Sequence, residues 1–221
     1  MATEAVAPAG DAALLSLTQW LSPAFPVGGY AFSQGLEWAI AEGVVASAED
    51  LAVWLGDVLA QGAGRSDAIM LSLAQREAMP LGALVDLARA LAPSRERWEE
   101  AEAQGAAFAA GLAALGRPLP EGVLPYAVAV GLAARGLGVA PQQVAALWLQ
   151  GMAGNLVQVA VRFVPLGQAE GQRVLAGLQP LILRLAAEAA TAGPEAIGSA
   201  AFGADLASMQ HEVMEVRLCR T

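Results

Sequence analysis

Apolar residues recur at spacings of three and four along most of the chain, which is the pattern of amphipathic helices. Alternation with a period of two, which marks half-buried strands, is hard to find. The pattern predicts helices over residues 12–21, 33–42, from 47 onward, 66–79, 80–92, 94–115, 124–135, 142–163 and 168–190, and a last segment from 194 to about 216. We therefore expect an all-α fold, a single-domain bundle of roughly eight to ten helices.

Capping residues and prolines mark several of the helix boundaries. Ser47 and Ser94 stand where an N-cap is expected, and Pro141 falls at a helix N-terminus, where its missing N–H costs nothing. Pro180 lies inside the predicted helix 168–190 and is expected to kink it.

Two predicted helices have distinctive faces. The segment 142–163 is apolar on nearly every side, which places it in the middle of the bundle. The helix 94–115 carries an apolar seam in which Ala101 and Gly105 are small enough for a neighbouring backbone to come close. The seam is formed by Trp98, Ala101, Gly105, Phe108, Leu112 and Leu115. Its acidic residues are expected on a solvated face: Glu96, Glu99, Glu100 and Glu102.

No internal repeat or linker divides the chain. We expect a flexible N-terminal tail over residues 1–11, one helical domain over 12–208 and a C-terminal partner-binding segment over 209–221.

Composition narrows the possible functions. The chain is 56% hydrophobic and 15% charged, its 12 basic residues are all arginine, and its net charge is -9, which argues against nucleic acid or an anionic membrane surface as a partner. The longest uncharged stretch, 136–161, is interrupted by proline and several amides and is expected to be a buried helix and not a membrane span. The N-terminus lacks a basic region of the secretory type, so we expect a cytoplasmic protein.

The scarcity of reactive residues excludes further chemistry. With one cysteine, Cys219, and one histidine, His211, the chain can form neither an intrachain disulfide nor a zinc motif of paired cysteines and histidines. Without lysine it has neither a P-loop of the usual type nor a Schiff-base catalyst. We therefore expect no cofactor and no resident metal.

One enzymatic alternative remains, a serine hydrolase. The segment 31–35 is a relaxed form of the G-x-S-x-G elbow around Ser33, and Asp205 and His211 follow in the order of the α/β-hydrolases. No strand precedes Ser33, however, and the simpler interpretation makes this residue a helix N-cap.

A second alternative is a direct metal carrier. His211 and Glu215 are four residues apart on a predicted helix, so they could offer two ligands to a metal and four in a symmetric dimer. A surface histidine–glutamate pair is the simpler interpretation.

Three blocks of sequence carry a family resemblance. They are the segment 22–37, SPAFPVGGYAFSQGLE; the segment 162–168, RFVPLGQ, followed by Gly171 and Gln172; and MQHE at 209–212 with RLCRT at 217–221. In this order they resemble the UreF family of urease accessory proteins, over roughly residues 12–221. The tail departs from the family pattern, with Val213, Met214 and Glu215 where a tyrosine is usual and with Cys219 in place of an aromatic residue.

The resemblance implies an all-helical, non-catalytic adaptor or chaperone, often a homodimer. Proteins of this family assemble with the accessory protein UreD (also called UreH) and the GTPase UreG on urease apoprotein, where the nickel metallocentre is built, and are thought to influence GTP hydrolysis by UreG. The resemblance further implies that the C-terminal tail docks UreD and that the helical body receives UreG.

The tail itself has a composition suited to docking. Met209, Val213 and Val216 form an apolar stripe that would fit a groove rimmed by charge, although intrachain packing would explain the stripe equally well. The expected partner-binding residues are Tyr30, Phe32, Met209, His211, Glu212, Arg217, Leu218 and Arg220.

Overall fold

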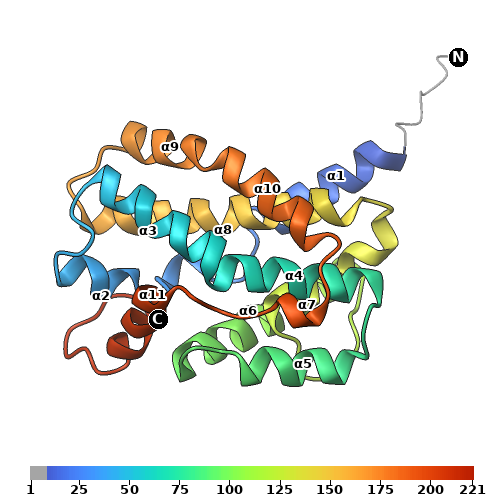
Figure 1. Cartoon of the computed structure of the whole chain (residues 1–221). Coiled ribbons are helices and arrows are strands. Elements are labelled where there is room, and N and C mark those ends of the chain that lie inside the picture. The colour runs from blue at the N-terminus through green and yellow to red at the C-terminus, as the bar shows by residue number, and fades with distance from the viewer. Residues whose placement is uncertain (1–8) are drawn as a thin grey trace, which may run out of the picture.

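A computed structural model describes residues 9–221, which form eleven α-helices and three short 3-10 helices and contain no strand (Figure 1). The prediction of an all-α fold is confirmed. The α-helices are α1 (Ala9–Trp20), α2 (Leu36–Ala41), α3 (Ala48–Gln61), α4 (Ala63–Arg76), α5 (Leu81–Ala90), α6 (Arg95–Ala114), α7 (Tyr126–Ala134), α8 (Pro141–Phe163), α9 (Gln168–Gly177), α10 (Gln179–Ala189) and α11 (Phe202–His211). The 3-10 helices are η1 (Gly29–Ala31), η2 (Arg135–Leu137) and η3 (Pro194–Ala196).

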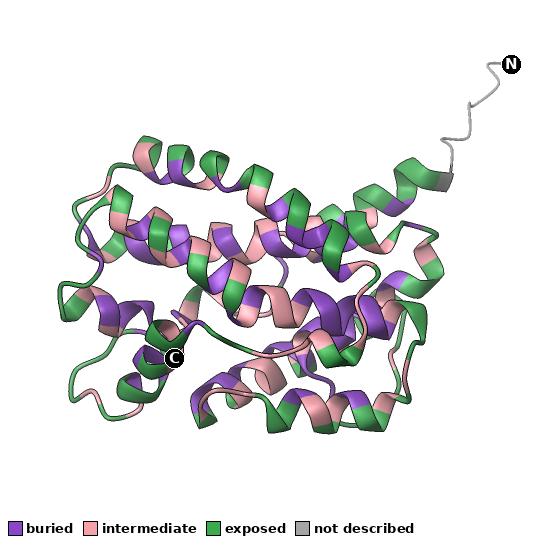
Figure 2. Ribbon diagram, viewed as in Figure 1, coloured by how far each residue is buried: buried purple, intermediate pink, exposed green. Residues whose placement is uncertain are grey.

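The core forms around α4 and α8. Helix α8 packs against α4, α9, α10, α2 and α3, while α4 also contacts α7 and α3. Figure 2 shows buried positions concentrated where these inner helices meet. Although α8 is long and apolar enough to cross a membrane by composition, half of its most apolar stretch is buried inside the chain. The prediction that 142–163 is a central helix is confirmed.

The predicted helix boundaries are confirmed where a cap or proline set them. The Ser47 hydroxyl accepts a hydrogen bond from the Asp50 N–H at 3.1 Å, and the Ser94 hydroxyl accepts one from the Arg97 N–H at 3.2 Å. Pro141 is the first residue of α8. Near Pro180 the predicted helix 168–190 is divided into α9 and α10.

Several predicted boundaries are wrong. Helix α4 begins at Ala63 and ends at Arg76, three residues before each end of the predicted helix 66–79. Helix α2 begins at Leu36 and its N-cap is Gly35, not Ser33, because Gln34 and Gly35 have φ values of 57° and 80°, in the left-handed region that a helix does not enter. The last predicted segment is helical only in η3 and in α11, and the chain after His211 has no regular structure. Of the predicted flexible tail, residues 1–8 lie outside the described part of the chain, and 9–11 belong to α1.

The seam of α6 is confirmed at its centre. Phe108 and Leu112 are fully buried, whereas Leu115 at the end is exposed. A Cβ atom placed on Gly105 would lie 1.8 Å from the carbonyl oxygen of Leu124, so the segment leading into α7 approaches this helix as closely as the small residue predicted.

Candidate functional site

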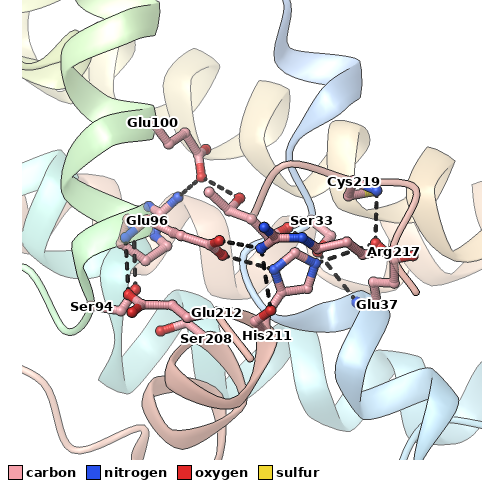
Figure 3. A network of polar contacts seen from close by, with 12 residues as sticks. Ser33, Glu37, Ser94, Glu96, Glu100, Ser208, His211, Glu212, Arg217 and Cys219 are labelled. Carbon is pink, nitrogen blue, oxygen red and sulfur yellow. Dashed lines mark hydrogen bonds and ion pairs between the residues drawn. The ribbon is translucent and has the colours of Figure 1, made fainter. Parts of the chain in front are cut away.

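The C-terminal segment, residues 212–221, folds back onto one end of the bundle, beside α2, α6 and α11 (Figures 1 and 3). Its last residues are held by hydrogen bonds to the loop before α2. The N–H of Ser33 donates to the carbonyl oxygen of Thr221 at 2.7 Å, and the N–H of Arg220 donates to the carbonyl oxygen of Ala31 at 2.7 Å. The Thr221 hydroxyl donates to Glu100 at 2.8 Å. The segment is therefore bound to two separate parts of the chain.

Glu37 of α2 is the main acceptor for this segment. Its Oε1 accepts from the N–H of Leu218 at 2.7 Å, and its Oε2 accepts from the N–H of Cys219 at 2.8 Å. Burial by itself raises the pKa of Glu37, but these two hydrogen bonds, together with the contact to His211, outweigh burial and leave the pKa below its usual value. The carboxylate form of Glu37 is thus the one that fits the folded chain.

His211 connects three elements at the end of α11. Its ring is fully buried, with Nδ1 2.8 Å from Glu96 of α6 and Nε2 3.3 Å from Glu37 of α2 (Figure 3). Glu96 is also an acceptor for the guanidinium of Arg217, and its N–H donates to Glu212 at 3.1 Å. The contacts fix the orientation of α11 relative to α2 and α6.

The acidic residues of α6 do not all lie on a solvated face, so that prediction is wrong for two of them. Glu96 and Glu100 are buried, and Arg97 between them is also buried and paired with Glu100. Because α11 and the C-terminal segment cover this side of α6, the carboxylates are satisfied by partners far along the chain. Glu99 remains exposed.

The predicted hydrolase triad is not assembled. The Ser33 hydroxyl donates to the carbonyl oxygen of Thr221, not to His211. Asp205 accepts a hydrogen bond from Ser199 at 2.6 Å, while the hydrogen-bond partners of the His211 ring among the described side chains are Glu37 and Glu96. The serine nucleophile therefore has no base, and the hydrolase alternative is not supported.

The structural basis of the metal-carrier alternative is also wrong. Helix α11 ends at His211, so Glu215 lies in irregular chain and the two residues do not share a helix face. Among residues 9–221 there is no group of three or more histidine, cysteine, aspartate or glutamate side chains placed to hold a metal ion.

The residues expected to bind partners divide into two groups. Phe32 and His211 are buried, and Glu212 is half-buried against the N-terminus of α6. The remaining five are exposed: Tyr30, Met209, Arg217, Leu218 and Arg220. The buried residues position the segment, and the exposed ones are available for contact.

Sequence reasoning missed the acceptors of this network. Glu37 was not singled out, although it is the one charged residue of α2, whose other five residues are apolar. A lone charge in an apolar helix indicates a buried polar contact, because an uncompensated buried charge is costly. Glu96 and Glu100 gave a weaker signal, since they alternate with exposed acidic residues.

An exposed apolar stripe runs along the outer face of α11. Phe202, Leu206 and Met209 are four and three residues apart and are exposed by 79%, 51% and 48%. Val213, in the turn that follows, is exposed by 74%. Ala207, Ser208 and His211 form the opposite, buried face. The helix is thus fixed on one side and apolar on the side that faces outward.

A cavity of about 180 Å³ lies between α4, α6 and α8, next to this network. Its wall includes Asp67, Arg97 and Glu100. Burial raises the pKa of Asp67 to about 6, with Arg97 lowering it and Glu100 raising it further. The ionised carboxylate of Asp67 therefore costs stability at neutral pH.

Replacing Asp67 by asparagine is expected to stabilise the protein by about 1–2 kcal/mol at pH 7.5. The folded-state pKa of Asp67 lies above the unfolded value of 3.8. Protonated Asp67 therefore makes its full contribution to folding stability below about pH 4, and this contribution is lost as the pH rises through about 6. The gain from Asp67→Asn should be smaller at pH 5.5 than at pH 7.5. Urea unfolding at the two pH values measures it, with the exposed Asp57→Asn as control; equal effects of the two substitutions would contradict the assignment.

Comparison with known proteins places the chain in a family. The model of the UreF family matches residues 45–179. A urease accessory protein UreF from Cereibacter sphaeroides strain KD131 is 61% identical over 212 residues, which cover 96% of this chain and 100% of the relative. Proteins of the same name from Jannaschia sp. and Paracoccus denitrificans are 56% and 51% identical, over 94% and 96% of this chain and 94% and 97% of their own lengths. The chain therefore belongs to the UreF family of urease accessory proteins.

Proposed function

We propose that the chain is a non-catalytic, cytoplasmic adaptor that assembles with a UreD-like (UreH-like) protein and a UreG-like GTPase on urease apoprotein while the nickel centre is built. Membership in the UreF family supports the general role. The observation that carries the docking part of the proposal is the apolar stripe on α11. We assign this stripe and the adjoining C-terminal segment to the UreD-like partner.

The exposure of the stripe supports this assignment. Burying apolar surface stabilises a protein or complex by about 25 cal/mol for each Å², and large apolar side chains that remain in water do not gain this free energy. Contiguous exposed apolar residues on a protein surface are typical of protein–protein interfaces. The C-terminal segment extends the apolar surface with Val216 and Leu218, each exposed by 80%. A partner that covers α11 would therefore bury apolar surface along both elements.

The rigidity of the surface supports the assignment as well. Glu37 accepts from two backbone N–H groups of the C-terminal segment and Glu100 accepts from the Thr221 hydroxyl, so little conformational entropy remains to be lost on binding. Arg217 and Arg220 lie beside the apolar side chains and are exposed. We expect the partner to offer an apolar groove with an acidic rim, since complementary charge steers association.

Tyr30 extends the surface at the same end of the bundle. The turn that carries it is anchored from α8, where Asn155 donates to the carbonyl oxygen of Gly29 at 2.9 Å and Arg162 donates to that of Tyr30 at 2.8 Å. The tyrosine side chain is 72% exposed. A fixed backbone and an exposed tyrosine are typical of an interface anchor. We assign the remaining surface of the helical body to the UreG-like GTPase and to a second copy of the chain.

Co-purification with UreD-like and UreG-like partners tests the proposal. We expect the full chain to form the complex, a version ending at Ser208 to lose the UreD-like partner, and Leu206→Asp to weaken that contact at least about 30-fold, because a charge would replace a central apolar contact. Leu206 is half-exposed, so the fold should tolerate the substitution.

The matched control is Val53→Asp. Val53 is exposed by 64% on α3 and belongs neither to the apolar stripe of α11 nor to the C-terminal segment, so its substitution should leave the UreD-like partner bound. If the version ending at Ser208 binds as well as the full chain, the docking assignment fails. If the full chain binds neither partner, the adaptor proposal fails.

A further inference from the structure

A single carboxylate on α2 holds two consecutive main-chain amides of the C-terminal segment. The N–H of Leu218 donates to Oε1 of Glu37 at 2.7 Å, and the N–H of Cys219 donates to Oε2 at 2.8 Å. Each oxygen of Glu37 therefore has its own amide donor. Charge-assisted hydrogen bonds of this kind are stronger than neutral ones, and they set the direction of the chain that donates them.

The same carboxylate also contacts the end of α11. His211 Nε2 lies 3.3 Å from Oε2 of Glu37, and Glu37 itself is 6% exposed. The helix with the apolar stripe and the segment that follows it are thus attached to one buried group. Glu37 therefore links α11 directly to the segment that follows it.

The exposed side chains of the segment lie directly beside these anchored amides. The N–H of Leu218 is held by Glu37 while its side chain is 80% exposed, and Arg217 precedes it. Movement of the anchored backbone would therefore move the side chains offered to a partner.

We propose that Glu37 is the positioning residue of the C-terminal segment: its carboxylate fixes residues 212–221 against α2 and so shapes the docking surface. This inference rests on the proposed function for its consequence in binding. The anchoring of the segment is a property of the chain alone and can be measured without a partner.

Glu37→Gln replaces one carboxylate oxygen of Glu37 by an NH₂ group and keeps the length of the side chain. A glutamine amide has one acceptor oxygen and one NH₂ donor, so one of the two amides, at Leu218 or Cys219, would face another donor. Glu37→Asp keeps both oxygens on a shorter side chain and should restore part of the anchoring. Glu42→Gln is the matched control, because Glu42 is exposed at the other end of α2.

The only cysteine of the chain responds both to release of the segment and to loss of the Glu37 charge, so its alkylation is interpreted together with amide exchange. Cys219 is 5% exposed, and burial together with the Glu37 carboxylate raises the pKa of its thiol to about 11. A released thiol has an ordinary pKa and reacts as a thiolate far more readily. At pH 7.5 we expect Glu37→Gln to increase the rate of Cys219 alkylation at least about tenfold, Glu37→Asp to increase it less, and Glu42→Gln to leave it unchanged.

Amide hydrogen exchange separates positioning from general destabilisation. Glu37→Gln should lower protection at Leu218 and Cys219 and leave the amides of α8 protected, whereas loss of protection throughout the chain would overturn the proposal. If Glu37→Gln does not fold, amide protection at Leu218 and Cys219 is compared between Glu37→Asp and Glu42→Asp, and the same outcomes support or overturn the proposal.

Binding to the UreD-like partner completes the test. We expect Glu37→Gln to weaken binding at least about tenfold and Glu42→Gln to leave it unchanged. Unchanged alkylation and exchange in Glu37→Gln would overturn the positioning role, even if binding to the partner is weakened. If the wild-type full chain binds no UreD-like partner, the proposed function fails, while alkylation and exchange still decide the role of Glu37.

Discussion

Replacing Gly105 by alanine is expected to destabilise the protein by about 3 kcal/mol or more. This is the largest effect that we expect of any glycine substitution where α6 contacts α7 and the segment before it. The new Cβ would lie 1.8 Å from the carbonyl oxygen of Leu124 and 3.0 Å from the backbone nitrogen of Tyr126. Both contacts are with backbone, so no side-chain rotation relieves them. Helix α6 would have to move away from the segment that leads into α7.

Thermal unfolding measures the loss. In a chain of this size a change of 3 kcal/mol corresponds to a fall of roughly 6–12 °C in Tm. Gly56→Ala in α3 is the matched control, because a Cβ there meets nothing within 4 Å. Alanine is favoured over glycine inside a helix, so Gly56→Ala should stabilise the protein by about 0.5–1 kcal/mol. A neutral or stabilising Gly105→Ala would show that α6 and the neighbouring segment are not held this closely.

The close approach at Gly105 could be predicted from the sequence because it depends on local spacing. Small residues on an apolar seam of α6 were sufficient to predict it. The same holds for the capping serines Ser47 and Ser94 and for the break near Pro180, since each acts through neighbours within four residues. All these predictions rest on interactions within one helix or at its ends.

The polar network could not be predicted in the same way. Glu96 meets His211, which is 115 residues away in the sequence, and Glu37 meets Cys219, which is 182 residues away. Local pattern assigns a charged residue to the solvent, and only the fold shows which distant segment covers it. The left-handed backbone at Gln34 and Gly35 was hidden for a related reason, because Gly35 fits against the backbone of Ser208 from another helix.

Replacing Arg97 by methionine is expected to destabilise the protein by about 3–5 kcal/mol at pH 7.5. Burial alone would lower the pKa of the Arg97 guanidinium, but Glu100 and Asp67 outweigh burial and raise it, so the charged form is retained. Methionine keeps much of the volume and removes the charge. Glu100 would then remain buried with hydrogen bonds from Gln34, Gln104 and Thr221 but without a counter-charge.

The double variant Arg97→Met with Glu100→Gln distinguishes loss of charge from loss of packing. If the uncompensated carboxylate is the main cost, neutralising Glu100 should recover at least half of the stability lost in Arg97→Met, and the two substitutions should be strongly non-additive in urea unfolding. Glu100→Gln alone should cost less, because Asp67 is close enough to interact with the Arg97 charge. Additive losses would mean that Arg97 stabilises the protein through packing. Non-additive losses would show that Arg97 compensates the buried side chain of Glu100, which also accepts from Thr221, and would link the stability of α6 to the anchoring of the C-terminal segment.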